Sequence, residues 1–184
     1  MSKKKKRKSL LSRSLKKIFD FGVFLLIVLI IVYLLSTYVI ERITIHNVSM
    51  EPTVSSEDVV FVDKISYRFK NPKRFDIIVF KQGSTGVELI KRVIALPNET
   101  VQIIDGEFVV DGERILDIEN LDSPVYEGMA SRPLRLLDGE YFVVGDNRIE
   151  SVDSRYEEVG LVKESNIIGR VFVRLLPLKD FRLY

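Results

Sequence analysis

A run of twenty residues without a charged side chain dominates the N-terminal part of this 184-residue chain. It extends from Phe21 to Ile40 and consists mainly of Leu, Ile, Val and Phe. At a rise of 1.5 Å per residue, a helix of this length spans about 30 Å, which is the thickness of a bilayer's hydrocarbon core. We therefore expect a single transmembrane anchor over residues 18–40.

The charges on either side of this run predict its orientation. Nine Lys or Arg residues and no acidic residue precede Asp20, whereas 19 basic and 25 acidic residues follow from Glu41 onward. By the positive-inside rule, residues 1–17 form a basic cytoplasmic tail and residues 41–184 lie outside the cytoplasm, so the protein is expected in the cell membrane. We expect the tail to contact anionic membrane lipids. The outer part carries a net charge of −6, which argues against nucleic acid binding.

A cleaved signal peptide is the alternative interpretation of the same segment. Its apolar region usually has about 7–15 residues, which is shorter than this run. The sequence Ser36-Thr37-Tyr38 offers no convincing small-x-small cleavage site. These two observations favour an anchor that is retained.

The outer part, residues 41–184, has the pattern of a mostly β, antiparallel domain. Asp105-Gly106 and Asp111-Gly112 stand between alternating apolar residues and predict type I′ hairpins, because both central positions of that turn need positive φ. Ile167–Leu176 is either one long strand or a strand pair. The other expected strands are residues 58–63, 76–81, 87–94, 100–104, 107–110, 113–116 and 140–144.

Helical periodicity is weak throughout this outer part. Glu157–Ser165 is the best candidate for a short helix, and Ile118–Arg135, with two Pro residues, is expected to be a loop. The domain begins directly after the anchor, so we expect it to lie against the membrane.

Ser49 lies nine positions after the apolar run, which makes it a candidate nucleophile at a membrane surface. A serine hydroxyl needs a neighbouring base to become nucleophilic. His46 is the only histidine, but residues i and i+3 of a strand point to opposite faces. His46 is more simply interpreted as a partly exposed strand residue than as the base.

Lys91 is the alternative base, because it lies within an apolar strand pattern. A lysine in such a place usually reaches solvent at an edge. Alternation, however, places Lys91 with Leu89 and Val93 on one face and Arg92 with Ile90 on the other, so at least one cation has apolar surroundings. Burial lowers the pKa of a lysine toward neutral pH, whereas an arginine keeps its proton.

A third polar cluster, Gly145–Arg155, follows the expected strand 140–144. Its Gly and Asn residues suit a tight turn, and its Ser, Asp and Arg residues form a dense set of hydrogen-bonding groups. On its own, this cluster is most simply a polar loop held by an Asp–Arg pair.

Taken together, the three clusters resemble the motifs of bacterial type I signal peptidases, which are membrane-bound Ser-Lys proteases. Ser49–Thr53 matches the family's Ser-Met-x-Pro-Thr, and Lys91–Pro97 matches its Lys-Arg-Val-x-Ala-Leu-Pro. Gly145–Arg155 matches Gly-Asp-Asn-Arg-x-x-Ser-x-Asp-Ser-Arg at every fixed position, and Asp58–Lys64 resembles a weaker fourth box. Order and spacing agree across the anchor and most of the outer part.

The resemblance implies a β-rich catalytic domain of the signal peptidase type, with Ser49 as nucleophile and Lys91 as general base. It also implies that Ser151 hydrogen-bonds and orients the Lys91 amine. The supporting residues that it implies are an Asp153–Arg155 ion pair, Asp146 and Arg148 in the same wall, and Met50 and Pro52 in the nucleophile turn.

Asn47 departs from the family, which often has Gly or Ser two residues before the nucleophile, where a donor helps to complete the oxyanion hole. The Asn47 amide is a possible donor there, beside the Ser49 backbone N–H. For the substrate pockets, the resemblance implies a shallow apolar lining made by Ile45, Met50, Val79 and Ile90.

The implied substrates are the signal peptides of preproteins that emerge from the translocation machinery, cut after a small-x-small pattern. The chain has no Cys and one His, so we expect no metal, and the implied chemistry needs no cofactor. A non-catalytic, membrane-anchored module in surface-protein assembly is the alternative, although such a module has no reason to retain both Ser49 and Lys91. A self-cleaving Ser-Lys repressor is disfavoured by the anchor. The oligomeric state is left open.

Overall fold

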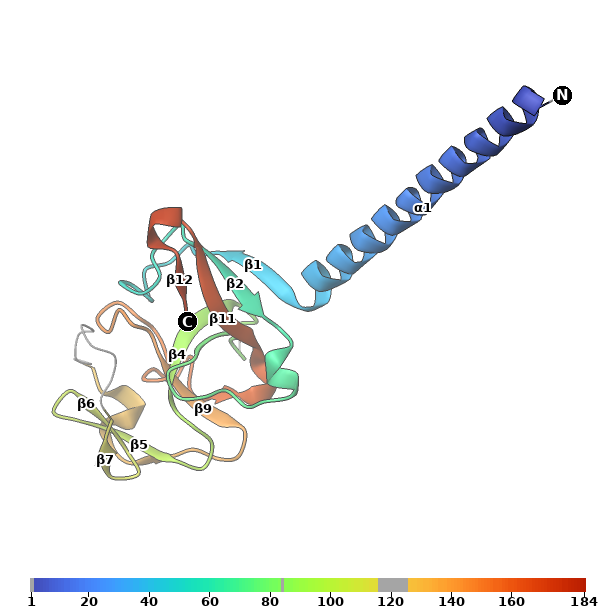
Figure 1. The fold of residues 1–184 in the computed structure, drawn as a ribbon. Helices are drawn as coiled ribbons and strands as arrows, with labels where there is room; N and C mark the ends of the chain where they lie inside the picture. The colour runs from blue at the N-terminus through green and yellow to red at the C-terminus, as the bar shows by residue number, and fades with distance from the viewer. Residues whose placement is uncertain (1, 84, 116–125) are drawn as a thin grey trace. The chain divides into compact units, whose positions relative to one another are not determined.

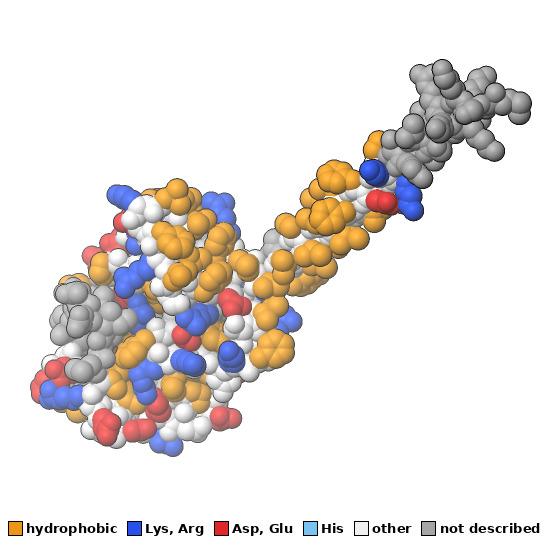
Figure 2. All heavy atoms as spheres, in the orientation of Figure 1, with side chains coloured by type: hydrophobic (Ala, Val, Ile, Leu, Met, Phe, Trp, Pro, Cys, Tyr) orange, Lys and Arg blue, Asp and Glu red, His pale blue; other side chains and the backbone are white. Residues whose placement is uncertain are grey.

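The computed structural model describes residues 2–83, 85–115 and 126–184, and it divides the chain into two units, Met1–Val39 and Ile40–Tyr184. The first unit is a single helix, α1 (Ser2–Tyr38) (Figure 1). Its stretch Lys16–Leu35 is long and apolar enough to cross a membrane. Its large apolar side chains are exposed, and Figure 2 shows them covering the helix surface.

The helix differs from the expected anchor at both ends. It continues on the N-terminal side through the basic residues, and it ends at Tyr38 because Ile40 already belongs to a strand. The sequence pattern assigned Ile40 to the anchor because an apolar residue suits either element.

The second unit contains two antiparallel sheets, as expected for a mostly β domain (Figure 1). The larger sheet has the order β1-β2-β11-β3-β4-β9-β10, with β12 paired to β11, and the smaller has the order β7-β6-β5-β8. The strands of the larger sheet are β1 (Ile40–Thr44), β2 (Val59–Asp63), β3 (Ile77–Lys81), β4 (Glu88–Ala95), β9 (Glu140–Val144), β10 (Val162–Lys163), β11 (Ile167–Leu176) and β12 (Arg182–Leu183). Those of the smaller sheet are β5 (Thr100–Ile104), β6 (Glu107–Val110), β7 (Glu113–Arg114) and β8 (Leu134–Arg135).

The Asp-Gly turns confirm the hairpin predictions. Asp105-Gly106 joins β5 to β6, Asp111-Gly112 joins β6 to β7, and all four residues have positive φ. Local sequence therefore determines these connections.

The predicted helix over Glu157–Ser165 is wrong. The segment consists of turns, the short strand β10 and the first two residues of the 3₁₀ helix η3 (Glu164–Asn166), because Val162 is buried and pairs with Tyr141 of β9. Tertiary pairing overrides a weak local helical preference here. Short 3₁₀ helices cover the remaining connections: η1 (Ser66–Arg68), η2 (Gly128–Ser131), η3 (Glu164–Asn166) and η4 (Leu178–Asp180).

The expected loop Ile118–Arg135 is described only from residue 126 onward, and it contains η2 and β8 there. Leu116, the end of an expected strand, lies outside the described residues.

Ile167–Leu176 forms one long strand, β11, which lies between β2 and β3. Gly169 marks a register shift against β3 and lies close beside β2. A Cβ added at Gly169 would lie 2.3 Å from the carbonyl oxygen of Asp63. The two strands pack closely because this residue has no side chain.

We expect Gly169→Ala to destabilise the domain by about 1–3 kcal/mol, because the methyl group forces the strands apart. Chemical denaturation of the variant measures this loss. Gly83→Ala is the control, since its added Cβ meets only the Asn166 side chain at an ordinary 3.7 Å. Equal stability of the two variants would contradict the close approach.

Candidate active site

The serine identified from the sequence lies in a tight turn after β1. The Val54 N–H donates to the Met50 carbonyl at 2.9 Å, and the Glu51 N–H donates to the Val48 carbonyl at 3.1 Å. Met50 and Val54 are buried in the apolar cluster of the larger sheet. The packing of Met50 and Val54 in the core therefore fixes the position of the turn. Ser49 itself is only 8% exposed.

Lys91 lies on β4, opposite Ile78 of β3, and is 2% exposed. Its Nζ is 2.8 Å from Ser49 Oγ and 3.0 Å from the Ile90 carbonyl oxygen. The structure thus brings together two residues 42 positions apart, at the distance that proton transfer requires.

Burial lowers the pKa of Lys91 from its ordinary 10.5 to about 8. Desolvation of the ammonium is the largest cause. Asp153 opposes the shift, Arg155 adds to it, and Asp146 opposes it. The amine is consequently half deprotonated near pH 8.

Asp153 organises the loop that closes the site. Its carboxylate accepts hydrogen bonds from Ser151 Oγ at 2.7 Å, the Gly145 N–H at 3.0 Å and Arg155 Nε at 2.8 Å. Arg155 also donates to the Arg148 carbonyl at 2.8 Å. Because this ion pair is fully buried, loss of either partner would leave an uncompensated charge.

The same loop packs against the nucleophile. A Cβ at Gly145 would lie 2.4 Å from the Ser49 carbonyl oxygen and 2.2 Å from Ser151 Oγ, so only glycine fits there. Asn147 donates from its backbone N–H to the Ser49 carbonyl at 3.1 Å and from Nδ2 to the Val48 carbonyl at 3.2 Å. The turn therefore depends on the loop for its position.

Ser151 lies against the site, but its hydroxyl donates to Asp153. In the described part of the chain, Lys91 Nζ bonds to Ser49 and to the Ile90 carbonyl, and no hydrogen bond joins it to Ser151. The structure therefore differs from the expected Ser151–Lys91 hydrogen bond, and Asp153, which accepts from Ser151, acts on the amine through its charge.

Asp146 and Arg148 contact different groups. Asp146 accepts from Arg92 Nε at 2.7 Å and from Nη2 at 2.5 Å, so both cations of the Lys91-Arg92 pair are buried. The Arg148 guanidinium lies 5.0 Å from the centre of the Phe108 ring. Sequence alternation indicated that at least one of the two neighbouring cations has apolar surroundings, and the Asp146 carboxylate explains how both are accommodated.

Asn47 faces Ser49 with its carbonyl oxygen. Oδ1 accepts from the Ser49 backbone N–H at 3.3 Å and from Ser49 Oγ at 2.9 Å. The amide oxygen, and not the amide N–H, therefore occupies the space in front of the backbone donor.

Comparison with known proteins identifies the family of the chain. A family model described as "Signal peptidase, peptidase S26" matches residues 18–176. The chain belongs to the signal peptidase family. It is a peptidase, a hydrolase of the class that removes signal peptides, and α1 anchors it in the membrane.

Individual relatives carry the same description. A probable signal peptidase I-2 of Synechocystis sp. is 36% identical over 148 residues, covering 77% of this chain and 66% of its own. Signal peptidase I V of Bacillus subtilis is 40% identical over 136 residues, covering 68% and 79%. A solved signal peptidase I from Enterococcus faecalis V583 is 33% identical, covers 55% of this chain and 97% of its own, and has a TM-score of 0.47.

The residues expected to line the substrate pockets of this signal peptidase share one buried cluster. Ile45, Met50, Val79 and Ile90 pack together with Val54 and the neighbouring strands. Each is at most 6% exposed. The two described cavities are lined by other residues, so a role of this cluster in substrate binding stays a prediction.

His46 lies apart from the dyad. Its Nδ1 is 3.4 Å from Glu57 Oε1, and its side chain is 74% exposed. Among the described residues, no hydrogen bond joins it to Ser49. His46 is exposed, but it lies two residues after the end of β1 and not within a strand as expected. The described residues also contain no group of three side chains able to hold a metal ion.

Sequence reasoning missed the residues that hold the far end of the turn. The Thr53 carbonyl accepts from Arg174 Nη1 at 3.1 Å and from the Tyr184 hydroxyl at 2.8 Å. Both donors lie more than 120 positions away in the sequence, and no local motif marks them.

Proposed function

We propose that the chain cuts signal peptides from preproteins with Ser49 as nucleophile and Lys91 as general base. The observation that carries this proposal is the 2.8 Å approach of Lys91 Nζ to Ser49 Oγ inside a buried site. Desolvation lowers the pKa of Lys91 to about 8, so that part of the amine is neutral at physiological pH and can accept a proton.

Acylation begins when neutral Lys91 takes the hydroxyl proton of Ser49. The Oγ then attacks the scissile carbonyl carbon and forms a tetrahedral intermediate. The ammonium of Lys91 returns a proton to the leaving amine, the C–N bond breaks, and an ester joins the signal peptide to Ser49. In the second half, neutral Lys91 takes a proton from water as the water oxygen attacks the ester carbonyl. The C–Oγ bond then breaks, Lys91 returns the proton to Ser49 Oγ, and the signal peptide leaves as a carboxylic acid.

The oxyanion needs donors in front of Ser49. The backbone N–H of Ser49 is one such donor. In the free protein, Asn47 Oδ1 accepts the hydrogen bond of this N–H and so occupies the place that the oxyanion would take. The substrate carbonyl must displace this oxygen, and the same movement frees the Ser49 hydroxyl to turn toward Lys91. Rotation of the carboxamide then presents its N–H₂ as a second donor to the oxyanion.

The substrate strand is expected to pair with β4. Residues Glu88–Lys91 pair with β3 on one side, whereas β9 pairs with β4 only from Arg92 onward. Along Glu88–Lys91, no described strand occupies the other edge, so an extended peptide fits there by strand addition and passes Lys91. We expect Ile45 and Ile90 to help form the shallow apolar pockets that accept small side chains.

The orientation follows from charge. We propose that the basic residues before Asp20 remain in the cytoplasm and contact anionic lipid, that α1 crosses the membrane once, and that the domain from Ile40 faces the other side. Signal peptides that emerge from the translocation machinery end at that surface.

Ser49→Ala and Lys91→Met should each lower preprotein cleavage by roughly 10⁴-fold or more, because each removes one half of the dyad. Cleavage of a preprotein in detergent by purified full chain measures the loss. Lys81→Met removes an exposed lysine of β3 and is the matched control. Near-normal turnover by either dyad variant, with circular dichroism like that of the control, would refute the assignment and favour a non-catalytic module.

The pH profile of kcat/KM should rise through a midpoint near 8, because the base is the neutral amine and protonation of Lys91 below its pKa removes it. Below this midpoint the rate should fall about tenfold per pH unit. Initial rates between pH 6 and 10 measure the profile. A flat profile from about pH 6 to 9 would count against Lys91 as the titrating base.

Asn47→Asp should lower kcat/KM by about 10²–10³-fold, since a carboxylate donates nothing to the oxyanion and repels its charge. The added charge beside the dyad should also raise the pKa of Lys91 and move the pH midpoint upward. Asn47→Ala, which lacks the charge, should show a smaller loss of kcat/KM and an unchanged midpoint of the pH profile. Wild-type kinetics for Asn47→Asp would show that the carboxamide stays out of the oxyanion hole.

A further inference from the structure

One peptide group connects the nucleophile turn to Tyr184, the residue after β12. The amide between Thr53 and Val54 donates its N–H to the Met50 carbonyl at 2.9 Å. The C=O of the same amide accepts from the Tyr184 hydroxyl at 2.8 Å. A peptide group is planar and rigid, so a partner that orients its C=O also orients its N–H. The tyrosine hydroxyl therefore acts on the turn through Met50, the residue next to Ser49.

Tyr184 is itself fixed by its backbone and by its ring. Its N–H donates to the Phe172 carbonyl at 3.0 Å, and its backbone oxygen accepts from Arg170 Nη2 at 2.6 Å. Its ring packs against the apolar cluster that contains Met50 and Ile90, which adjoin the two dyad residues in the sequence. The hydroxyl is therefore presented to the turn from a fixed position.

Thr53 has two further donors, and both are arginines that are shared with carboxylates. Arg174 Nη1 donates to its carbonyl at 3.1 Å, but the same guanidinium lies 2.8 Å from Asp58 Oδ2. Arg92 Nη2 lies 3.5 Å from Thr53 Oγ1, but it also donates to Asp146. The carboxylates direct both guanidinium groups, so the neutral tyrosine hydroxyl is the donor that is aimed at the turn.

We propose that Tyr184 is a positioning residue, whose hydroxyl holds the nucleophile turn so that Ser49 Oγ stays within proton-transfer distance of Lys91. This proposal rests on the Ser-Lys reaction proposed above, since the tyrosine itself exchanges no proton with the substrate. A misplacement of the reacting atoms by about 1 Å costs roughly 10²-fold in rate. Arg174 remains as a second donor, so loss of the hydroxyl should cost less, about tenfold.

Tyr184→Phe in the purified full chain removes the hydroxyl and keeps the ring. We expect kcat for preprotein cleavage in detergent to fall about tenfold with KM unchanged, because the dyad geometry is altered and the substrate contacts are not. Burial raises the pKa of Tyr184 above its ordinary value, so its hydroxyl is protonated throughout the range in which Lys91 titrates. The pH profile of the variant should therefore keep its midpoint near 8.

A donor restored at the same ring position separates hydrogen bonding from packing. Tyr184→4-aminophenylalanine, introduced by nonsense suppression, carries an N–H donor in place of the hydroxyl and should recover most of the kcat. Tyr184→4-methylphenylalanine fills the same space without a donor and should stay as low as Tyr184→Phe. Equal kcat values for the amino and methyl variants would overturn the proposal, since they would show that only the filled space matters.

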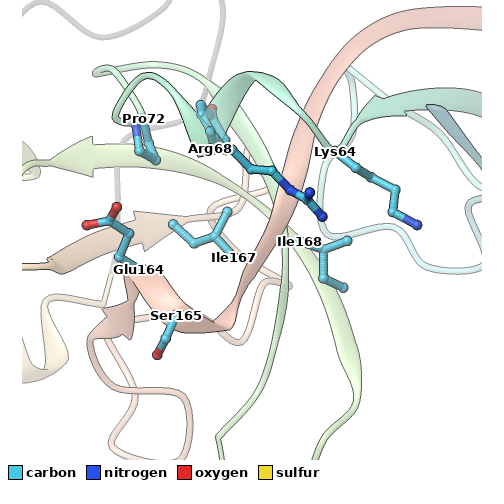
Figure 3. A pocket seen from close by; sticks show the side chains of 8 residues that line it. Lys64, Arg68, Pro72, Glu164, Ser165, Ile167 and Ile168 are labelled. Carbon is cyan, nitrogen blue, oxygen red and sulfur yellow. The ribbon is translucent and has the colours of Figure 1, made fainter. Parts of the chain in front are cut away.

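Tyr67→Phe is the matched control for the loss of a tyrosine hydrogen bond. The Tyr67 hydroxyl donates to Asp76 Oδ2, also at 2.8 Å. Tyr67 lines a cavity of about 410 Å³ together with Arg68 and Ile168 (Figure 3). The residues around this cavity belong to segments 64–72 and 164–168, and not to the nucleophile turn. The control should lower the free energy of unfolding in chemical denaturation and keep the wild-type kcat.

The outcomes distinguish the positioning role from the dyad itself. Wild-type kcat in Tyr184→Phe, a rise in KM in place of the fall in kcat, or an equal loss of kcat in Tyr67→Phe would each overturn the positioning role. Ser49→Ala is assayed beside these variants. Near-normal turnover by Ser49→Ala would refute the dyad, whereas Ser49-dependent turnover that is insensitive to Tyr184→Phe would overturn the role of the tyrosine alone.

Discussion

The burial of one amine determines the chemistry of this site. Lys91 lies on a central strand, and removal of water from its ammonium is the largest cause of its lowered pKa. A lysine at the surface would stay protonated at neutral pH and would not accept the proton of Ser49. The β3–β4 register, the nucleophile turn and the loop from Gly145 to Arg155 all serve to cover this one group.

The residues that cover Lys91 include charged side chains in two ion pairs, and these can be buried because each charge is paired with an opposite one. The Arg92–Asp146 and Asp153–Arg155 pairs are both buried and fix the loop to β4 and to itself. Buried pairs of this kind contribute little net stability, but removal of one partner is costly. Their positions explain why the motif residues form one set: Gly145 allows the close approach to Ser49, Asp153 holds the loop, and Asn147 fixes the turn.

Local patterns predicted much of this structure, and tertiary contacts determined the rest. The Asp-Gly hairpins and most strands follow from turn chemistry and alternation, and the dyad follows from motif resemblance. Ile40 was assigned to the anchor because apolarity does not separate a helix end from a strand start. The helix expected over Glu157–Ser165 is replaced by β10, which pairs with a strand about twenty residues earlier. The partner of Asp146 and the donors to Thr53 lie too far away in sequence for any local signal, and the acceptor orientation of Asn47 depends on a side-chain rotation that composition does not encode.

Membrane anchoring and catalysis meet in the short strand β1, which runs from the end of α1 to the nucleophile turn. Ser49 lies nine positions after Ile40, the first residue of β1, and Lys91 is the proposed base. The central claim is that burial lowers the pKa of Lys91 to about 8. Titration of the ¹⁵N-labelled lysine side chains by NMR measures this directly. The account predicts one amine with a midpoint near 8 that is absent from Lys91→Met, and it is contradicted if every lysine titrates near the ordinary 10.5.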